Sequence, residues 1–186
     1  HILHVLPLHH IHGIINVLCC ALWSGAVCEM LPRFDARAVY NIFLKGRCSM
    51  FMAVPTVYAK LIVTWEQMPP YEQENITAAC SKMRLMISGS AALPMKIFER
   101  WETISRHTLL ERYGMTEIGM ALSNPYEGER RPGFVGLPLP GMEICLVDEQ
   151  GNIVTDEHQA GEIRVRGENV FREYWDREEA TREAFT

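Results

Sequence analysis

The stretch that decides the fold is RLMISGSAALPMKIFERWETISRHTLLERYGMTE, residues 84–117. A short apolar run opens it and leads into a loop of small residues, after which Pro94 is suited to start a helix. That helix has an apolar stripe at helical spacing, formed by Ile97, Trp101 and Ile104. A second apolar run at 109–111 completes a strand–helix–strand unit, the building block of a parallel sheet covered by helices.

The same alternation extends upstream. Strands are expected at residues 2–6, 26–31 and 49–54, with 26–31 buried, and helices at 13–23, 35–46, 55–65 and 71–79. Asp35 is placed to cap its helix, because its carboxylate can accept from the first free N–H groups. Residues 1–125 are therefore predicted to form a parallel α/β sheet.

After residue 125 the pattern changes. Gly and Pro separate short strand-like runs at 143–147, 152–154 and 162–166, and a charged helix is expected at 177–185. Residues 126–186 are predicted to be a small β-rich, barrel-like subdomain of the same domain.

Bulk properties exclude two kinds of partner. The 186 residues carry a net charge of −5, so the basic surface that nucleic acid requires is not expected. Residues 2–28 contain no charged side chain, but Pro7, three histidines and Ser24-Gly25 divide them into pieces shorter than the ~20 residues of a membrane span. Neither nucleic acid nor a transmembrane segment is predicted.

Six cysteines occur without any CxxC pair, which disfavours a zinc cluster or a thioredoxin-like site. Most of them lie in apolar runs. They are predicted to be small buried hydrophobic residues in a reducing compartment.

The strongest chemical signal is YGMTE, residues 113–117, directly after a predicted strand. Tyr113 offers a flat face for a base, Gly114 permits close backbone approach, Thr116 can donate to phosphate and Glu117 suits Mg²⁺. Loops at the carboxyl ends of parallel strands are where α/β folds bind ligands. The alternative is a capped turn, in which Thr116 starts a short helix and Tyr113 fills the core.

Two further segments are candidate ligand contacts. SGSAALP, residues 88–94, exposes backbone N–H groups in a small-residue loop, although a tight strand-to-helix turn explains it equally well. PLHHIHG, residues 7–13, holds three histidines close to His4. No carboxylate or cysteine is near, so histidines satisfied within the fold or facing a ligand are favoured over a metal site.

YGMTE resembles the adenine-and-magnesium motif of the ANL adenylating enzymes, which include acyl-CoA synthetases and luciferases. Four other segments resemble family motifs in the right order: residues 7–13, 88–92, 135–141 and 161–167. The resemblance implies the large N-terminal domain of such an enzyme, truncated before the C-terminal domain.

The resemblance also implies roles for particular residues. Tyr113 and Gly114 would contact adenine together with Ser90 and Ala91. Thr116 would hold the α-phosphate and Glu117 would ligate Mg²⁺. His10 aligns with the family histidine at the acyl pocket and is a candidate catalytic residue together with Thr116 and Glu117.

Within the family, residues 88–93, 111–117, 124–131 and 168–175 resemble malonyl-CoA synthetases, including the mitochondrial animal ones. Malonate brings a second carboxylate, and burying that charge without a partner is costly. Arg112 is the predicted partner, with Ser90, His10 and His12 as hydrogen-bonding neighbours. The alternative is a surface arginine paired with Glu111 or Glu117.

The implied activity is ligation of malonate, with methylmalonate tolerated, to CoA through an acyl-adenylate. ATP, Mg²⁺ and CoA are the implied cofactors and co-substrate, and the mitochondrial matrix is the implied location. A medium-chain fatty acyl- or aryl-CoA ligase and a non-catalytic truncated isoform stay open. The family's phosphate loop and C-terminal lysine lie outside residues 1–186, so this piece alone is expected to be inactive.

Overall fold

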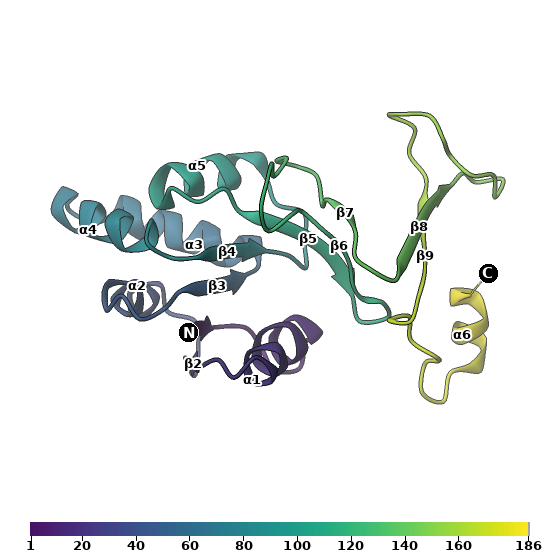
Figure 1. The fold of residues 1–186 in the computed structure, drawn as a ribbon, viewed down its shortest axis with the longest axis horizontal. Helices are drawn as coiled ribbons and strands as arrows, with labels where there is room; N and C mark the ends of the chain where they lie inside the picture. The colour runs from purple at the N-terminus through teal and green to yellow at the C-terminus, as the bar shows by residue number, and fades with distance from the viewer. Residues whose placement is uncertain (186) are drawn as a thin grey trace.

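The computed structural model describes residues 1–185 and is built around a seven-stranded sheet (Figure 1). Its strand order is β2-β1-β3-β4-β5-β6-β7. Pairing is parallel from β2 to β5 and antiparallel from β5 to β7. The strands are β1 (Ile2–His4), β2 (Cys28–Met30), β3 (Met50–Ala53), β4 (Leu85–Ser88), β5 (Leu110–Met115), β6 (Gly119–Ser123) and β7 (Leu137–Pro138). The predicted parallel α/β sheet is confirmed.

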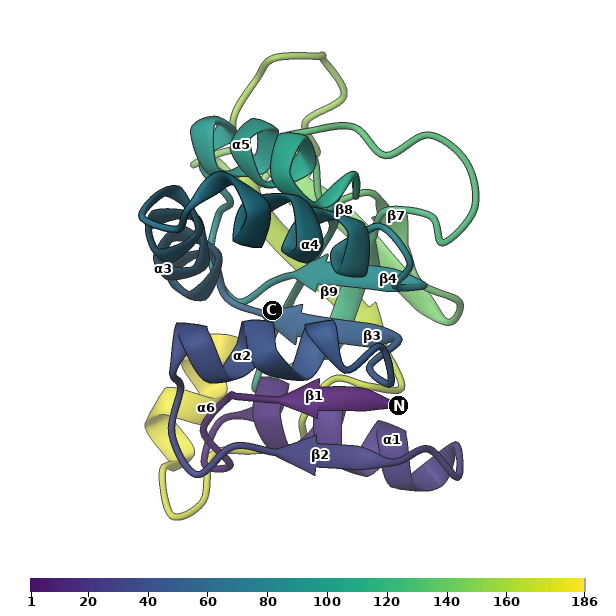
Figure 2. The same ribbon diagram turned by 90° about the vertical axis from the view of Figure 1, so that its left-hand side faces the viewer.

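Helices cover both faces of the parallel part of the sheet (Figures 1 and 2). The helices are η1 (His12–Cys19), α1 (Cys20–Trp23), α2 (Ala36–Leu44), α3 (Pro55–Glu66), α4 (Pro70–Cys80) and α5 (Met95–Ser105). Successive strand residues point to opposite faces. Met52 packs with residues of η1 and α1, whereas its neighbours Phe51 and Ala53 join the larger core under α2 to α5.

The larger core is organised by a chain of edge-to-face aromatic contacts. Phe43, Phe51, Tyr58 and Trp101 follow one another with ring centroids 5.2, 5.9 and 5.1 Å apart. Trp101 is fully buried, and its indole N–H donates to the Met86 sulfur at 3.2 Å. Such pairs add stability beyond the area that they bury.

Several local predictions are confirmed and one is corrected. The Asp35 carboxylate accepts from the Ala38 N–H at 2.7 Å and so caps α2. Trp101 and Ile104 of the predicted stripe are buried. Strand β2 is only half-buried, because it lies at the edge of the described sheet, so the prediction of a buried strand there is wrong.

Strand β5 is longer than its apolar run predicts. It continues to Met115 because it pairs with β6, with Tyr113 opposite Leu122 and Met115 opposite Gly119. A register shift occurs between Tyr113 and Gly114. A Cβ at Gly114 would lie 2.1 Å from the Gly119 carbonyl oxygen, so the close approach requires glycine. The prediction that Tyr113 and Gly114 lie in a loop is therefore wrong.

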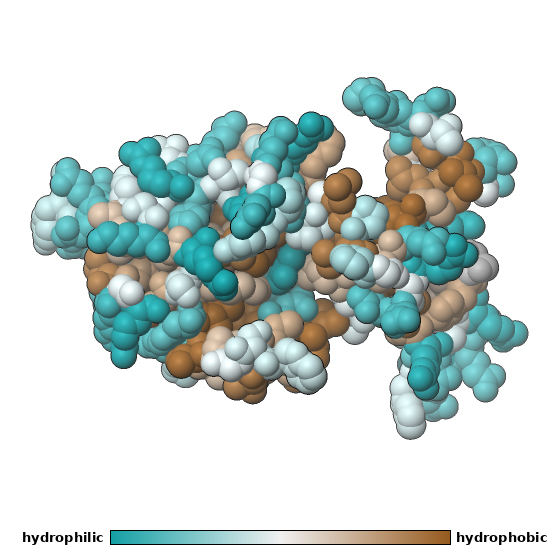
Figure 3. All heavy atoms as spheres, in the orientation of Figure 1, coloured by the Kyte–Doolittle hydropathy of each residue, from teal (hydrophilic) through white to brown (hydrophobic). Residues whose placement is uncertain are grey.

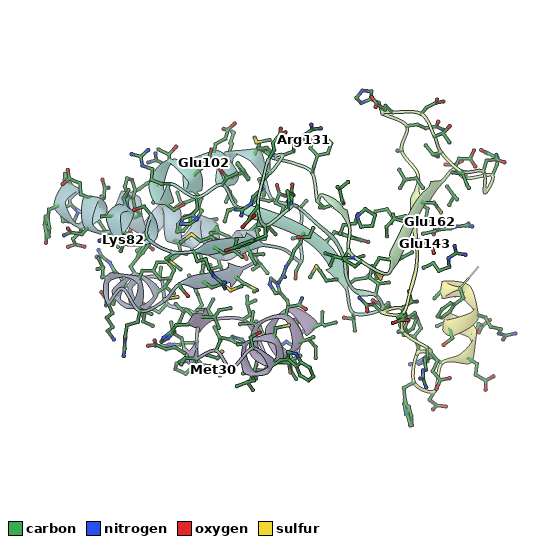
Figure 4. All side chains as sticks on the ribbon, in the orientation of Figure 1. Met30, Lys82, Glu102, Arg131, Glu143 and Glu162 are labelled. Atoms are coloured by element: carbon green, nitrogen blue, oxygen red, sulfur yellow. The ribbon has the colours of Figure 1, made fainter. Side chains whose placement is uncertain are left out.

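The C-terminal third is a hairpin-like pair of strands followed by a helix. β8 (Met142–Val147) pairs antiparallel with β9 (Glu162–Gly167), and α6 spans Glu178–Ala184. Glu143 of β8, labelled in Figure 4, pairs with Arg166 across the strands. Since β7 still belongs to the seven-stranded sheet, the division at residue 125 and the barrel-like subdomain stay predictions.

Two cysteines depart from their prediction. Cys48 and Cys80 are buried and Cys28 and Cys145 are half-buried, but Cys19 and Cys20 are exposed. The apolar run predicts burial of that helix on all sides, whereas Ile14, Ile15, Leu22 and Trp23 are also exposed. Figure 3 shows hydrophobic surface over this part of the molecule.

Membrane insertion gains no support from the helices. None within residues 1–185 combines the length and the apolar character needed to cross a bilayer.

We predict that Trp101→Ala lowers the free energy of unfolding by about 3–5 kcal/mol, because it leaves a cavity in the aromatic chain. Urea denaturation of the protein measures this loss. Trp175→Ala is the matched control: its side chain is 90% exposed, so a change within about 0.5 kcal/mol is expected. Equal losses in the two variants would contradict the packing described for Trp101.

Candidate functional site

Three segments meet at the carboxyl edge of β4 and β5. Ser88 pairs with Glu111, which brings the following Gly89 alongside Arg112. A Cβ at Gly89 would lie 3.5 Å from the Arg112 carbonyl oxygen and 3.7 Å from the His12 ring. The start of η1, the small-residue loop and β5 therefore share one location, where parallel α/β folds bind ligands.

Arg112 is half-buried and has no carboxylate partner within the described residues. One guanidinium nitrogen donates to the Met52 sulfur at 3.1 Å, and Nε is buried without any hydrogen bond. Burial lowers the pKa of Arg112 from its usual value. A thioether is a weak acceptor, so most donors of this cation are free for a ligand.

The surface ion pair considered for Arg112 is wrong. Glu111 lies on the other face of β5, is buried, and accepts from the Gly133 N–H at 3.1 Å. Glu117 accepts from the Tyr174 hydroxyl at 2.8 Å. Both carboxylates thus have other partners, and Nε of the Arg112 guanidinium is buried rather than on the surface.

His12 is the histidine that reaches this site. It is 5% exposed, and its Nδ1 lies 2.9 Å from the Ser90 hydroxyl oxygen. Its Nε2 is buried without a partner among residues 1–185. Burial, with nearby Arg112 and His4, lowers the pKa of His12 to about 4. The ring is neutral at physiological pH and offers one free nitrogen.

The other histidines have different positions. His4 Nδ1 accepts from the Leu6 N–H at 3.2 Å, so its Nε2 carries the proton and donates to the Gly13 carbonyl at 2.9 Å. His10 is exposed, with its ring centroid 4.3 Å from that of His9. His4 therefore stabilises the loop, and His12 rather than His10 contacts Ser90.

The residues predicted to bind the nucleotide lie at the end of β5 and in the loop that follows β4. Tyr113 is half-buried against a small cluster that includes Ile118 and Leu122. Thr116 and Ala91 are exposed. Ile118 N–H donates to the Met115 carbonyl at 3.2 Å, which closes the turn between β5 and β6. Thr116 thus begins a hairpin turn, and the alternative in which it caps a helix is wrong.

Glu117 is the only one of the candidates that suits a divalent cation. Nowhere in residues 1–185 do three His, Cys, Asp or Glu side chains come together as a metal site. Mg²⁺ is commonly bound by one or two carboxylates together with substrate phosphates. A single hard carboxylate beside the exposed Thr116 fits that mode and does not fit a cage made by protein alone.

Sequence reasoning missed Met52 and Tyr174. Met52 lies in an apolar strand, where nothing distinguishes it from a core residue. Tyr174 lies in the stretch 168–175, which resembles malonyl-CoA synthetases but in which no residue was predicted to have a functional role. Its contact with Glu117 joins residues 57 positions apart in the sequence.

Comparison with known proteins identifies relatives along the whole chain. Malonate–CoA ligase ACSF3, mitochondrial, of Bos taurus is 50% identical over 210 residues, covering 100% of this chain and 36% of the relative. The malonate–CoA ligase of Arabidopsis thaliana is 41% identical, covering 100% of this chain and 32% of the relative. The chain thus spans about a third of the length of these relatives.

Solved structures agree with the described fold. ATP-bound MatB from Rhodopseudomonas palustris matches with a TM-score of 0.87 and 37% identity, over 100% of this chain and 35% of that one. A malonyl-CoA ligase in a ternary product complex with methylmalonyl-CoA and AMP matches with a TM-score of 0.88 and 37% identity, over 100% and 38%. The model of the AMP-binding enzyme family matches residues 1–175, and this chain belongs to that family.

Proposed function

We propose that the protein containing this chain ligates malonate to CoA at the expense of ATP and tolerates methylmalonate. The observation that carries this proposal is Arg112, a half-buried cation with a buried, unpartnered Nε and no carboxylate partner within the described residues, on the same edge of the sheet as His12 and Ser90. Relatives named malonate–CoA ligases, at 41–50% identity, support the same substrate.

The substrate argument is electrostatic. A monocarboxylic acid uses its one carboxylate in the reaction, and its tail offers nothing to the guanidinium. Malonate brings a second carboxylate that Arg112 can pair with, and the Ser90 hydroxyl and His12 Nε2 are candidate hydrogen-bonding groups on the same edge of the sheet. A charge-assisted, bidentate contact of this kind also fixes the orientation of the substrate.

The proposed reaction has two steps. One malonate carboxylate oxygen attacks the α-phosphorus of ATP, the bond to the β-phosphate oxygen breaks, and pyrophosphate leaves. The CoA thiol, after losing its proton, then attacks the acyl carbon, and AMP leaves with the bonding electrons. Adenylation is needed because a free carboxylate is a poor electrophile. Catalysis of the first step is mainly positioning and charge neutralisation.

The remaining roles follow the family resemblance. Tyr113 would stack on adenine beside Gly114, Ala91 and Ser90, and Thr116 would donate to the α-phosphate. Glu117 would hold Mg²⁺, which neutralises charge on the phosphates when bound. His10 would border the acyl pocket.

Location in the mitochondrial matrix is proposed on the names of the animal relatives alone, which describe mitochondrial ligases. Fractionation of cells expressing the full-length protein tests it.

We predict that Arg112→Leu in a protein of the family's full length lowers kcat/KM for malonate by about two to four powers of ten. Removing one member of a buried charge pair costs about 3–5 kcal/mol. The ratio of kcat/KM for malonate to that for butyrate measures the effect, since butyrate never uses the arginine.

Arg84→Leu is the matched control for that substitution. Arg84 also donates to a methionine sulfur, Met50, but it is exposed at the opposite end of β4. In Arg84→Leu, the ratio of kcat/KM for malonate to that for butyrate should equal the ratio in the unmodified enzyme. An unchanged ratio in Arg112→Leu would remove the main support for malonate and favour a fatty acyl- or aryl-CoA ligase.

A second prediction concerns pH. Because the pKa of His12 is lowered to about 4, the ring loses no proton between pH 6 and 8 and acts only through hydrogen bonds. His12→Phe should lower malonate kcat/KM about 2- to 10-fold, the value of one or two hydrogen bonds, with a pH profile parallel to that of the unmodified enzyme. A cationic His12 would give a profile that falls as pH rises through 6.5, and that fall would vanish in the variant.

A third prediction concerns the chain alone. Residues 1–186 should show no ATP–pyrophosphate exchange, because the family's phosphate loop and C-terminal lysine, which would contact the anionic triphosphate, lie outside these residues. Measurable exchange by the purified chain would contradict this and would show that the candidate site suffices.

A further inference from the structure

The segment that follows β9 lies against the turn that carries Glu117. The Phe171 N–H donates to the Glu117 carbonyl at 2.7 Å, and the Tyr174 hydroxyl donates to Glu117 Oε1 at 2.8 Å. A Cβ at Gly119 would lie 3.9 Å from the Asn169 side chain. Two hydrogen bonds therefore join residues 171–174 to Glu117, and Asn169 lies near the same turn.

We propose that Tyr174 is a positioning residue for the Glu117 carboxylate, which holds Oε1 and leaves Oε2 free for the Mg²⁺ that Glu117 would ligate. The proposal rests on the proposed function, in which Glu117 ligates that ion. It assigns to the region after β9 a part in binding the metal–nucleotide complex.

A glutamate needs such support because its terminal torsion is broad and poorly fixed by rotamer preference alone. Hydrogen-bond donors behind a metal ligand fix its orientation. A phenol is well suited here, since it satisfies one oxygen and leaves the negative charge of the carboxylate in place. A lysine or arginine at the same position would compete with the cation.

Tyr174 is itself held in place. Its backbone N–H donates to the Thr181 hydroxyl at 2.9 Å, which ties it to α6. Its ring lies against Phe171, with centroids 4.7 Å apart, and Phe171 stacks on Phe185 at 5.2 Å. The hydroxyl that reaches Glu117 thus belongs to a ring with its own aromatic neighbours and a backbone tie to α6.

A purely structural latch is the alternative. The backbone contact between Phe171 and Glu117 already docks the segment, and substitution of Tyr174 by phenylalanine leaves it intact. Loss of the hydroxyl alone should then change how Glu117 meets the cation, without detaching the segment from the turn.

The test is Tyr174→Phe in the full-length protein, with ATP affinity measured by calorimetry in Mg²⁺ and, separately, in EDTA. Affinity with Mg²⁺ should fall roughly 10-fold, as is typical when a group supporting a metal ligand is removed. Affinity in EDTA should stay within about twofold, because the nucleotide contacts of Tyr113 and Thr116 persist. The Mg²⁺ concentration giving half-maximal ATP–pyrophosphate exchange should rise by a similar factor.

Three further variants make the result interpretable. Tyr126→Phe is the matched control: its side chain is 52% exposed, and its hydroxyl makes no hydrogen bond within the described residues, so both affinities should be unchanged. In Glu117→Gln, the ATP affinity with Mg²⁺ should no longer exceed the ATP affinity in EDTA. In that background Tyr174→Phe should add nothing, because the two residues act as one unit.

The outcomes separate the two proposals. If Glu117→Gln keeps full Mg²⁺ dependence, the magnesium role in the proposed function fails. If Glu117→Gln loses it but Tyr174→Phe behaves like Tyr126→Phe, only the positioning role is overturned. Equal losses with Mg²⁺ and with EDTA in Tyr174→Phe, or additive losses in the double variant, also overturn it and leave a structural latch.

Discussion

The site is arranged around one constraint: the guanidinium of Arg112 is partly removed from water and has no carboxylate partner within the described residues. Burial lowers the pKa of Arg112, and its one acceptor is the Met52 sulfur. Placing an ion in the interior costs several kcal/mol unless a counter-charge meets it. The fold carries this cost at the edge of its sheet where a ligand can enter. An anionic substrate would supply the missing counter-charge and so remove this free-energy cost.

The side chains of β5 point alternately to the two faces of the sheet, so neighbouring residues of this strand have different surroundings. Glu111 is on the side of the sheet that faces the larger core, and its carboxylate accepts from the Gly133 N–H. Burial raises the pKa of Glu111. Arg112 points to the opposite face, beside His12. Beyond Glu111 the strand leaves β4 as a partner and continues only along β6, starting with Arg112 opposite Ser123. One strand therefore anchors the loop at Gly133, places Arg112 beside His12 and leads into the turn with Glu117.

Local chemistry explains which features the sequence could predict. The strand–helix alternation, the Asp35 cap and the stripe of α5 depend on neighbours in the chain, and they appear as expected. The extension of β5 depends on β6, which has no strong turn signal before it. His10 and His12 are indistinguishable in a loop pattern, because only packing against Ser90 selects between them. Tyr174 depends on a contact across 57 residues, for which local patterns carry no information.

Pairing with β6 carries β5 from Arg112 to the turn that holds Glu117. Glu117 follows Arg112 by five positions, a span of up to about 16 Å in an extended chain. Where β5 steps from Tyr113 to Gly114, its partner in β6 changes from Leu122 to Met120, so the extra residue of this bulge is Ala121 on β6. Gly114 permits the shift because any larger residue would collide with the Gly119 carbonyl. The glycine of the motif is thus needed for the strand geometry itself, which sets Glu117 apart from Arg112 before any nucleotide binds.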